Sequence, residues 1–143
     1  MERKTMSTKI DFIYEADLQC QILHTPSGQT LVTDVPEDLG GKNTSFSPTD
    51  LVASGVVSCI LTTMAIAARR RGIDLAGLKA QAIKEMISEP VRRIGTIKVG
   101  IQMPAGINLS VPDRQKIENA ANLCPAKRSL HPEVNVLLEF IYR

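Results

Sequence analysis

The most reactive side chains of this sequence belong to its three cysteines, Cys20, Cys59 and Cys124. No pair has the C-x-x-C spacing of a zinc site or a thioredoxin-like site, so we expect no metal site. The odd number argues against a structural disulfide framework. Widely separated cysteines in a reducing compartment are either inert core residues or reactive thiols, and their types and spacing alone leave both possibilities open.

Cys59 and Cys124 have different local surroundings. Cys59 lies in the middle of an apolar stretch, where burial is expected to raise the thiol pKa because it disfavours the charged form. Cys124 precedes Pro125 at the start of a predicted short helix, whose unpaired backbone N–H groups favour a thiolate. Lys127 and Arg128 add positive charge nearby. On local sequence alone, Cys124 is the better thiolate candidate.

The two histidines, His24 and His131, are weaker candidates for catalysis. A cysteine–histidine pair that activates a nucleophile needs direct contact, and only His131 is near a cysteine in the sequence. We interpret both as surface or capping residues.

Cys59 must be positioned by a long helix that we predict over residues 47–72. Ser47 is the expected N-cap, and Asp50 can answer it across a capping box. Three consecutive arginines fall in the last turn, where cations suit the helix dipole, before Gly72 can close the helix.

The predicted helix is apolar on nearly every side, since residues 51–68 carry no charge. Such a helix is either buried in protein or spans a membrane. Recurrent serine and threonine, one glycine and several alanines reduce its hydrophobicity, so we expect no membrane span. The favoured interpretation is a central helix packed on several sides, partly by a second subunit.

The remaining elements are predicted from hydrophobic period and turn residues. Strands are expected at 9–16, 17–24, 29–34, 73–89, 94–103 and 133–142, with a hairpin about residues 90–93. Helices are expected at 111–123 and 125–130. The order is strands, long helix, strands, helix, strand, which favours an α+β fold with an antiparallel sheet over a parallel βαβ fold.

Length and composition indicate the number of domains and argue against some kinds of partner. A chain of 143 residues is expected to form one domain, over residues 1–143. Its 17 Lys and Arg residues nearly balance 15 Asp and Glu residues, and aromatic residues are few, which argues against a nucleic-acid partner. The first ten residues lack the apolar segment of a signal peptide, so a cytoplasmic location is expected.

Two segments carry a family resemblance. FSPTDLVASGVVSC, at the start of the long helix, and CPAKRSLHPEV, before the last strand, resemble the OsmC/Ohr family of thiol-dependent hydroperoxide-detoxifying proteins. HTPSGQTLVTD and KEMISEPVRRIG are more similar to a less characterised, OsmC-like branch. The resemblance covers nearly the whole chain. It implies an intertwined homodimer in which antiparallel sheets wrap around long central helices, with active sites at the subunit interface.

The resemblance also implies roles for two cysteines. The residue matching Cys59 is the peroxidatic nucleophile, oxidised to a sulfenic acid, and the one matching Cys124 resolves it as a disulfide. This reverses the ranking from local sequence. It further implies a stress-response peroxidase that uses an organic hydroperoxide and a dithiol reductant without a cofactor; it assigns no role to Cys20.

Two departures from the family pattern bear on the mechanism. The peroxidases place a glutamate directly after the proline of the helix start, where this chain has Thr49; Asp50 follows about 100° further round the helix. They also bring an arginine from the N-terminal strands, but residues 15–42 contain none, which leaves Arg92 or Arg93 as candidates. The alternative function is a non-catalytic dimeric module that binds a small apolar or electrophilic ligand at the subunit interface.

Overall fold

The computed structural model describes residues 3–143, which form two compact units. The N-terminal unit ends at Leu51, and the C-terminal unit runs from Val52 to Arg143. Both units lie inside the single domain expected over residues 1–143, which stays a prediction.

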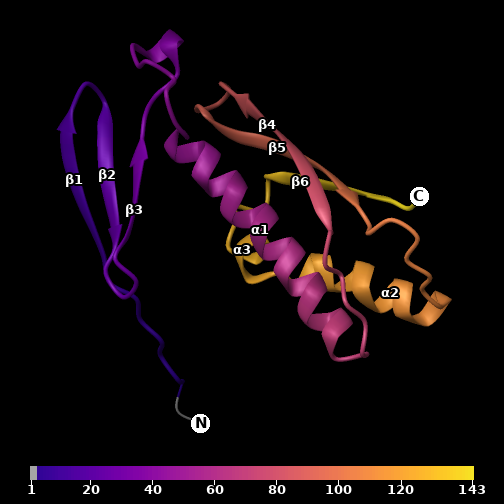
Figure 1. Ribbon diagram of the computed structural model, residues 1–143. Helices are drawn as coiled ribbons and strands as arrows, with labels where there is room; N and C mark the ends of the chain where they lie inside the picture. Colours follow the sequence, from indigo (N-terminus) through magenta and orange to yellow (C-terminus); the bar gives the residue numbers. More distant parts are fainter. Residues whose placement is uncertain (1–2) are drawn as a thin grey trace. The chain divides into compact units, whose positions relative to one another are not determined.

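The N-terminal unit is built on a three-stranded antiparallel sheet in the order β1-β2-β3 (Figure 1). The strands are β1 (Ile10–Ala16), β2 (Gln19–His24) and β3 (Gln29–Thr33), followed by the short helix η1 (Glu37–Leu39). The second strand starts two residues later than predicted, because Asp17 and Leu18 form the turn from β1 to β2. Both have positive φ, which is the geometry of a two-residue hairpin turn.

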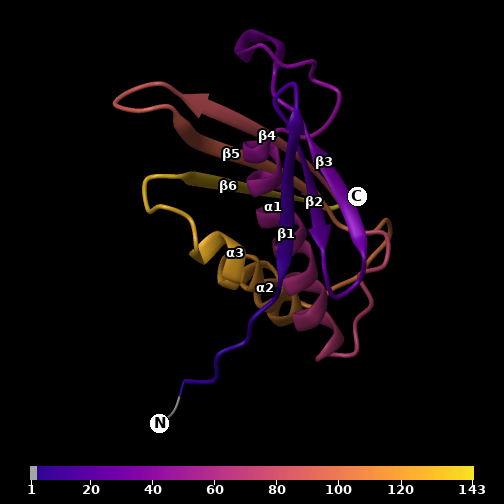
Figure 2. The same ribbon diagram turned by 90° about the vertical axis from the view of Figure 1, so that its left-hand side faces the viewer.

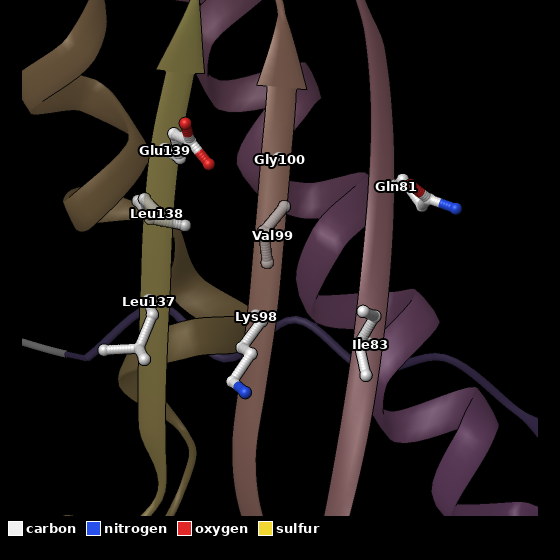
Figure 3. Close-up of a pocket in the computed structure, with 8 residues that line it drawn as sticks. All are labelled: Gln81, Ile83, Lys98, Val99, Gly100, Leu137, Leu138 and Glu139. Atoms are coloured by element: carbon white, nitrogen blue, oxygen red, sulfur yellow. The ribbon is translucent and has the colours of Figure 1, made fainter.

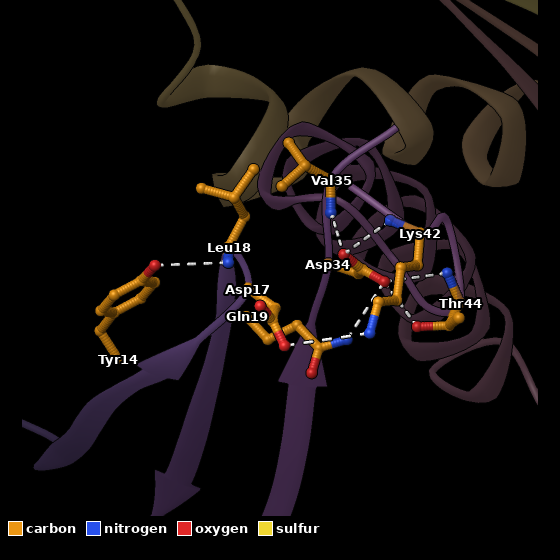
Figure 4. Close-up of polar contacts among 8 residues, drawn as sticks. All are labelled: Tyr14, Asp17, Leu18, Gln19, Asp34, Val35, Lys42 and Thr44. Atoms are coloured by element: carbon orange, nitrogen blue, oxygen red, sulfur yellow. Dashed lines mark hydrogen bonds and ion pairs between the residues drawn. The ribbon is translucent and has the colours of Figure 1, made fainter. Parts of the chain in front are cut away.

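A buried carboxylate holds the loop after β3. The side chain of Asp34 is 1% exposed and accepts hydrogen bonds from the backbone N–H groups of Val35, Lys42 and Thr44, at 2.7, 3.4 and 3.1 Å (Figure 4). It also accepts one from the Thr44 hydroxyl at 2.5 Å and one from the Gln19 amide at 3.3 Å. Five donors therefore fold residues 34–44 around one side chain.

The long helix α1 (Pro48–Arg69) begins in the N-terminal unit and lies mostly in the C-terminal unit. The predicted capping box is confirmed: the Asp50 N–H donates to Ser47 Oγ at 3.1 Å, and the Ser47 N–H donates to Asp50 Oδ2 at 2.9 Å. By length and composition alone α1 could cross a membrane, but that is weak evidence, since the core helix of a soluble protein passes the same test.

The C-terminal unit contains the other six elements. They are β4 (Lys79–Ile87), β5 (Arg93–Gln102), α2 (Val111–Ala120), η2 (Ala121–Leu123), α3 (Pro125–Arg128) and β6 (Asn135–Ile141). The strands form a sheet in the order β4-β5-β6, and Figures 1 and 2 show α2 and the C-terminal part of α1 on one face of it.

One strand pair departs from the antiparallel expectation. β4 pairs with β5 antiparallel, but β6 pairs with β5 in parallel, with Thr96 opposite Asn135 and Gln102 opposite Ile141. A parallel pair needs a long crossover, and α2, η2 and α3 supply it. The α+β fold class is confirmed; a purely antiparallel C-terminal sheet is wrong for this pair.

The core of the C-terminal unit joins α1 to the sheet and α2. α1 contributes a buried stripe of Ala53, Val56, Ile60, Met64 and Ala68, spaced three or four residues apart as one helix face requires. β5 and the residue directly after it contribute every second residue from Ile97 to Met103. Cys124 belongs to this same buried cluster, so the core brings the α1 helix and the segment before α3 together.

Candidate functional site

The fold brings two of the three cysteines together in the C-terminal unit. Cys59 lies half-buried on α1, and Cys124, which is 0% exposed, lies between η2 and α3. Each of these two thiols affects the pKa of the other. All three cysteines are free. The structure therefore shows a dithiol in which one sulfur is partly accessible and the other is enclosed.

The environment of Cys59 favours its charged form. The backbone N–H of Ala126, in the first turn of α3, donates a hydrogen bond that lowers the pKa of the Cys59 thiol. Burial opposes this effect, while Cys124 and Thr63 lower the pKa further. Thr63 Oγ1 lies 3.9 Å from Cys59 Sγ, one turn along α1. Fixed donors around a sulfur stabilise the thiolate, which is the nucleophilic form.

The environment of Cys124 has the opposite effect. Burial raises the pKa of the Cys124 thiol, and the neighbouring Cys59 raises it as well. The Lys127 N–H donates to Cys124 Sγ at 3.2 Å, which lowers the pKa without offsetting burial. The Cys124 thiol can also donate to the carbonyl oxygen of Val56, 3.9 Å away. Cys124 is therefore held as a protonated thiol beside a more acidic one.

This arrangement contradicts the ranking of the two thiols from local sequence. The amides of α3 were expected to activate Cys124, because Cys124 is the N-cap of that helix. In the folded chain Cys59 receives the Ala126 amide, while Cys124 is fully desolvated. The expected increase in the Cys59 pKa is also wrong, because the hydrogen bonds outweigh burial.

The remaining polar candidates lie elsewhere. Cys20 is half-buried on β2 in the N-terminal unit. Exposed His131 accepts a hydrogen bond at Nδ1 from the Glu133 N–H at 3.1 Å, and His24 is bonded to Ser27 near the β2–β3 turn. Within residues 3–143, no group of three His, Cys, Asp or Glu side chains is placed to hold a metal ion.

A shallow hollow lies over the C-terminal sheet. It has a volume of about 390 Å³, and Ile83, Lys98 and Leu137 lie side by side across its three strands (Figure 3). Gly100 opens space at its centre. Its lining includes no cysteine, so it offers no nucleophile and is a weaker candidate than the dithiol.

A comparison with protein families matches the part of the chain that contains the dithiol. The sequence profile of the OsmC-like protein family matches residues 41–139, a span that includes both cysteines of the dithiol. The chain belongs to the OsmC-like family.

Solved structures of OsmC-like proteins share the fold. A proposed osmotic stress induced and detoxification response protein from Psychrobacter arcticus 273-4 is 33% identical, with a TM-score of 0.87 over 99% of this chain and 100% of that one. The organic hydroperoxide resistance protein OsmC from Legionella pneumophila is 16% identical, with a TM-score of 0.75 over 96% and 98%. The organic hydroperoxide resistance protein OhrB of Bacillus subtilis is 18% identical, with a TM-score of 0.68 over 95% and 98%. None of the curated proteins matches the chain.

The supporting residues considered for this OsmC-like chain lie in two places. Thr49 and Asp50 are in the first turn of α1, in the N-terminal unit, where Asp50 closes the capping box. Arg93 donates to Glu133 Oε2 at 3.1 Å, and Arg92 is exposed. Within residues 3–143, hydrogen-bonding groups lower the Cys59 pKa and no cationic side chain contributes. A catalytic role for these four residues stays a prediction.

Two contributors to the site were not among the predicted residues. The Ala126 N–H and the Thr63 hydroxyl both act on Cys59. The proline that starts α3 signals free amides in the next positions, so Ala126 could have been found as a donor. The thiol that receives this donor is set by tertiary packing.

Proposed function

We propose that this protein is a thiol-dependent peroxidase that reduces organic hydroperoxides, with Cys59 as the peroxidatic nucleophile and Cys124 as the resolving thiol. One observation carries the proposal: the two thiols pack in the same core cluster, and their pKa values are shifted in opposite directions. A low-pKa, accessible thiol next to a protonated one has the properties required of a nucleophile and its resolving partner.

The reaction balances in three steps. The Cys59 thiolate attacks the terminal oxygen of ROOH, the O–O bond breaks, and the alkoxide leaves as ROH after taking a proton. The resulting Cys59 sulfenic acid condenses with the Cys124 thiol, which forms the disulfide and releases water. A dithiol reductant then exchanges with the disulfide and is itself oxidised. We place this cycle in the cytoplasm, where thiols are kept reduced.

The experiment that tests the proposal follows hydroperoxide consumption with excess dithiol. We expect turnover of tert-butyl hydroperoxide by the wild type and none by Cys59→Ser. Cys20→Ser is the control, since Cys20 lies outside the dithiol, and it should turn over like the wild type. If hydroperoxide treatment leaves neither a Cys59 sulfenate nor a Cys59–Cys124 disulfide by mass spectrometry, the proposed function is wrong.

We further propose that the active form is a homodimer. The sheet of the N-terminal unit exposes large apolar side chains on both faces, among them Phe12 (63% exposed) and Ile13. The buried hydrophobic core cluster draws all its members from the C-terminal unit. A sheet that exposes large apolar side chains on both faces usually marks a protein–protein interface. Analytical ultracentrifugation should give a dimer, and Phe12→Asp should weaken it, whereas a monomeric wild type would contradict the proposal.

The alternative is a non-catalytic dimeric module that binds a small apolar or electrophilic ligand. It is favoured by one observation: hydrogen bonds alone, with no cationic side chain among the described residues, lower the pKa of Cys59. Equal ligand affinity in the wild type and Cys59→Ser, with no hydroperoxide turnover in either, would establish it in place of the peroxidase.

A further inference from the structure

The segment that carries Cys124 is short and interrupted. Cys124 separates η2 from α3, which have three and four residues, and its backbone is extended, with φ −65° and ψ 131°. Helices this short are not stable by themselves, so contacts from outside must hold them. All of these residues lie within the C-terminal unit. The position of the Cys124 sulfur therefore depends on the few interactions that tie η2 and α3 together.

The backbone of α3 supplies no such tie, because its first three amides all bond to the two cysteines. The Ala126 N–H donates to the Cys59 sulfur. The N–H groups of Lys127 and Arg128 donate to the sulfur and to the carbonyl oxygen of Cys124, both at 3.2 Å. These three bonds orient the two cysteines, and none of them reaches η2.

A side-chain hydrogen bond joins α3 to η2 instead. The Lys127 ammonium donates to the side-chain carbonyl oxygen of Asn122, and this bond spans the break at Cys124. Lys127 thus bonds on both sides of the resolving thiol, since its backbone N–H holds the sulfur and its side chain holds η2. Asn122 is exposed and Lys127 is half-buried, so the bond closes the outer side of a segment whose cysteine is in the core.

The Lys127 ammonium acts through position rather than through charge. It is not among the groups that shift the pKa of Cys59 or Cys124, whereas the Lys127 amide lowers that of Cys124. Cys124 Sγ lies 3.9 Å from the carbonyl oxygen of Val56, about one turn before Cys59 on α1. A disulfide needs the two Cα atoms within about 7 Å and Cβ atoms that point toward each other, so small displacements of this segment matter.

We propose that Asn122 and Lys127 are positioning residues for the resolving thiol, and that their hydrogen bond sets the effective concentration of Cys124 at Cys59. The inference rests on the proposed function: the step it accelerates is the condensation of the Cys59 sulfenic acid with the Cys124 thiol, which forms the disulfide and releases water. Holding one reactant beside the other speeds such a step without changing its chemistry. A sulfenic acid that waits longer is oxidised to the sulfinic acid by a second hydroperoxide, which is reduced to the alcohol.

The first experiment uses no hydroperoxide. Glutathione disulfide oxidises the dithiol and is reduced to two glutathione molecules, and the equilibrium measures the effective concentration of the two thiols. Lys127→Met and Asn122→Ala should each lower it by roughly fivefold, the order expected for one net hydrogen bond. Asn122→Asp keeps an acceptor for the ammonium and should retain the wild-type value. Arg128→Met is the matched control, because it removes the adjacent charge from an exposed position without breaking the bond.

Three outcomes of that experiment would overturn the inference. They are an unchanged effective concentration in Lys127→Met, an equal loss in Arg128→Met, and a loss in Asn122→Asp as large as in Asn122→Ala. The double variant of Asn122→Ala and Lys127→Met should lose no more than either single variant, because both remove the same bond. A Lys127→Met protein that unfolds at lower urea but keeps the wild-type effective concentration would show that the bond is only structural.

The second experiment separates positioning from the oxidation step. After one equivalent of tert-butyl hydroperoxide, the Cys59 sulfenate should form at the wild-type rate in Lys127→Met but persist roughly fivefold longer by dimedone trapping. Excess hydroperoxide should then give more sulfinic acid in the variant. A lowered effective concentration in glutathione without any hydroperoxide turnover would overturn the peroxidase and keep the positioning role. Hydroperoxide turnover with equal sulfenate lifetimes in both proteins would overturn the positioning role and keep the peroxidase.

Discussion

The backbone N–H of Ala126 donates a hydrogen bond to the thiol of Cys59, although the two residues lie on different helices far apart in the sequence. The first turn of α3 therefore acts on a sulfur that belongs to α1. Its own N-cap, Cys124, receives the next amide, from Lys127. Amides of one four-residue helix thus act on both thiols, whose pKa values are shifted in opposite directions.

The Thr63 hydroxyl makes a smaller contribution that can be isolated. Thr63→Val removes the donor 3.9 Å from Cys59 Sγ while keeping the side-chain shape. Because Thr63 lowers the Cys59 pKa, the variant should have a higher Cys59 pKa and a roughly twofold slower reaction with iodoacetamide at neutral pH, the lower end for one hydrogen bond. Thr62→Val is the matched control, since Thr62 bonds only helix carbonyls. Equal rates in both variants would contradict the assignment.

Removing the resolving thiol should separate the two half-reactions. In Cys124→Ala, hydroperoxide can still oxidise Cys59, but no neighbouring thiol remains to condense with the sulfenic acid. We expect a single burst of about one alcohol per subunit and a sulfenate that dimedone labels, followed by slow turnover. The Cys59 pKa should rise, because the Cys124 hydrogen bond that lowers it is gone. Rapid multiple turnover would show that Cys124 is not the resolving residue.

The capping box at the start of α1 should contribute measurably to stability. Ser47→Ala removes the oxygen that accepts the Asp50 N–H, so the free energy of unfolding should fall by about 1 kcal/mol in urea titration. Ser54→Ala, on an exposed position of the same helix, is the control and should change it by less than about 0.5 kcal/mol. Equal effects would mean that the box contributes nothing beyond helix propensity.

Local patterns predicted most elements of this fold. The capping box and the proline at the start of α3 reflect contacts within a few residues, and the alternation along β5 reflects the two-residue period of a strand with one buried face. The turn at Asp17 and Leu18 was missed because leucine rarely adopts positive φ, so nothing in its type indicates a hairpin turn. The parallel pairing of β6 was missed because strand direction depends on where the crossover returns the chain.

The candidate site was predictable only in part. Cys59 and Cys124 were identified through their sequence contexts, but the sign of each pKa shift depends on tertiary contacts. Burial next to Val56 raises the pKa of Cys124, and the Ala126 amide lowers that of Cys59. Neither contact follows from residues near each cysteine in the sequence.

Tyr142 should make the stability of the fold depend on pH above about pH 10. Burial and the hydrogen bond that its hydroxyl donates to Glu118 Oε1 at 2.8 Å raise the pKa of Tyr142 to about 12. An unfolded tyrosine titrates near 10, so the stability linked to this group is present below about pH 10 and is lost as pH rises toward 12. In Tyr142→Phe the free energy of unfolding should therefore fall less between pH 10 and pH 12 than in the wild type.

Two charge variants test the cause of that shift. Glu118→Gln removes the negative charge beside the phenol and should lower the Tyr142 pKa, measured by ultraviolet titration. Glu139→Gln removes the same charge from an exposed position on β6 and should leave the titration as in the wild type. Identical titrations in both variants would show that Glu118 is not the partner.

Asp34 should control the acid limit of stability. The Thr44 hydroxyl, followed by the backbone N–H groups of Val35 and Thr44, holds the pKa of this carboxyl far below its usual range. An unfolded aspartate titrates near 4, so the stability from ionised Asp34 is complete above about pH 4 and is lost as pH falls toward the lower folded pKa. Asp34→Asn should reduce stability at neutral pH and weaken its dependence on pH below 4.

A second aspartate in the same loop, Asp38, provides the control for Asp34→Asn. Asp38→Asn changes an exposed carboxylate in η1. It should leave the free energy of unfolding nearly unchanged, both at neutral pH and below about pH 4. The two oxygens of the Asp34 carboxylate accept hydrogen bonds from different backbone N–H groups. Asparagine at this position has only one acceptor oxygen, and its NH₂ group faces the donors that bonded the other oxygen. At least one of the Val35 and Thr44 amides then loses its acceptor inside a buried site. If urea unfolding of Asp34→Asn matches that of Asp38→Asn from pH 7 to pH 3, the carboxylate does not hold this loop.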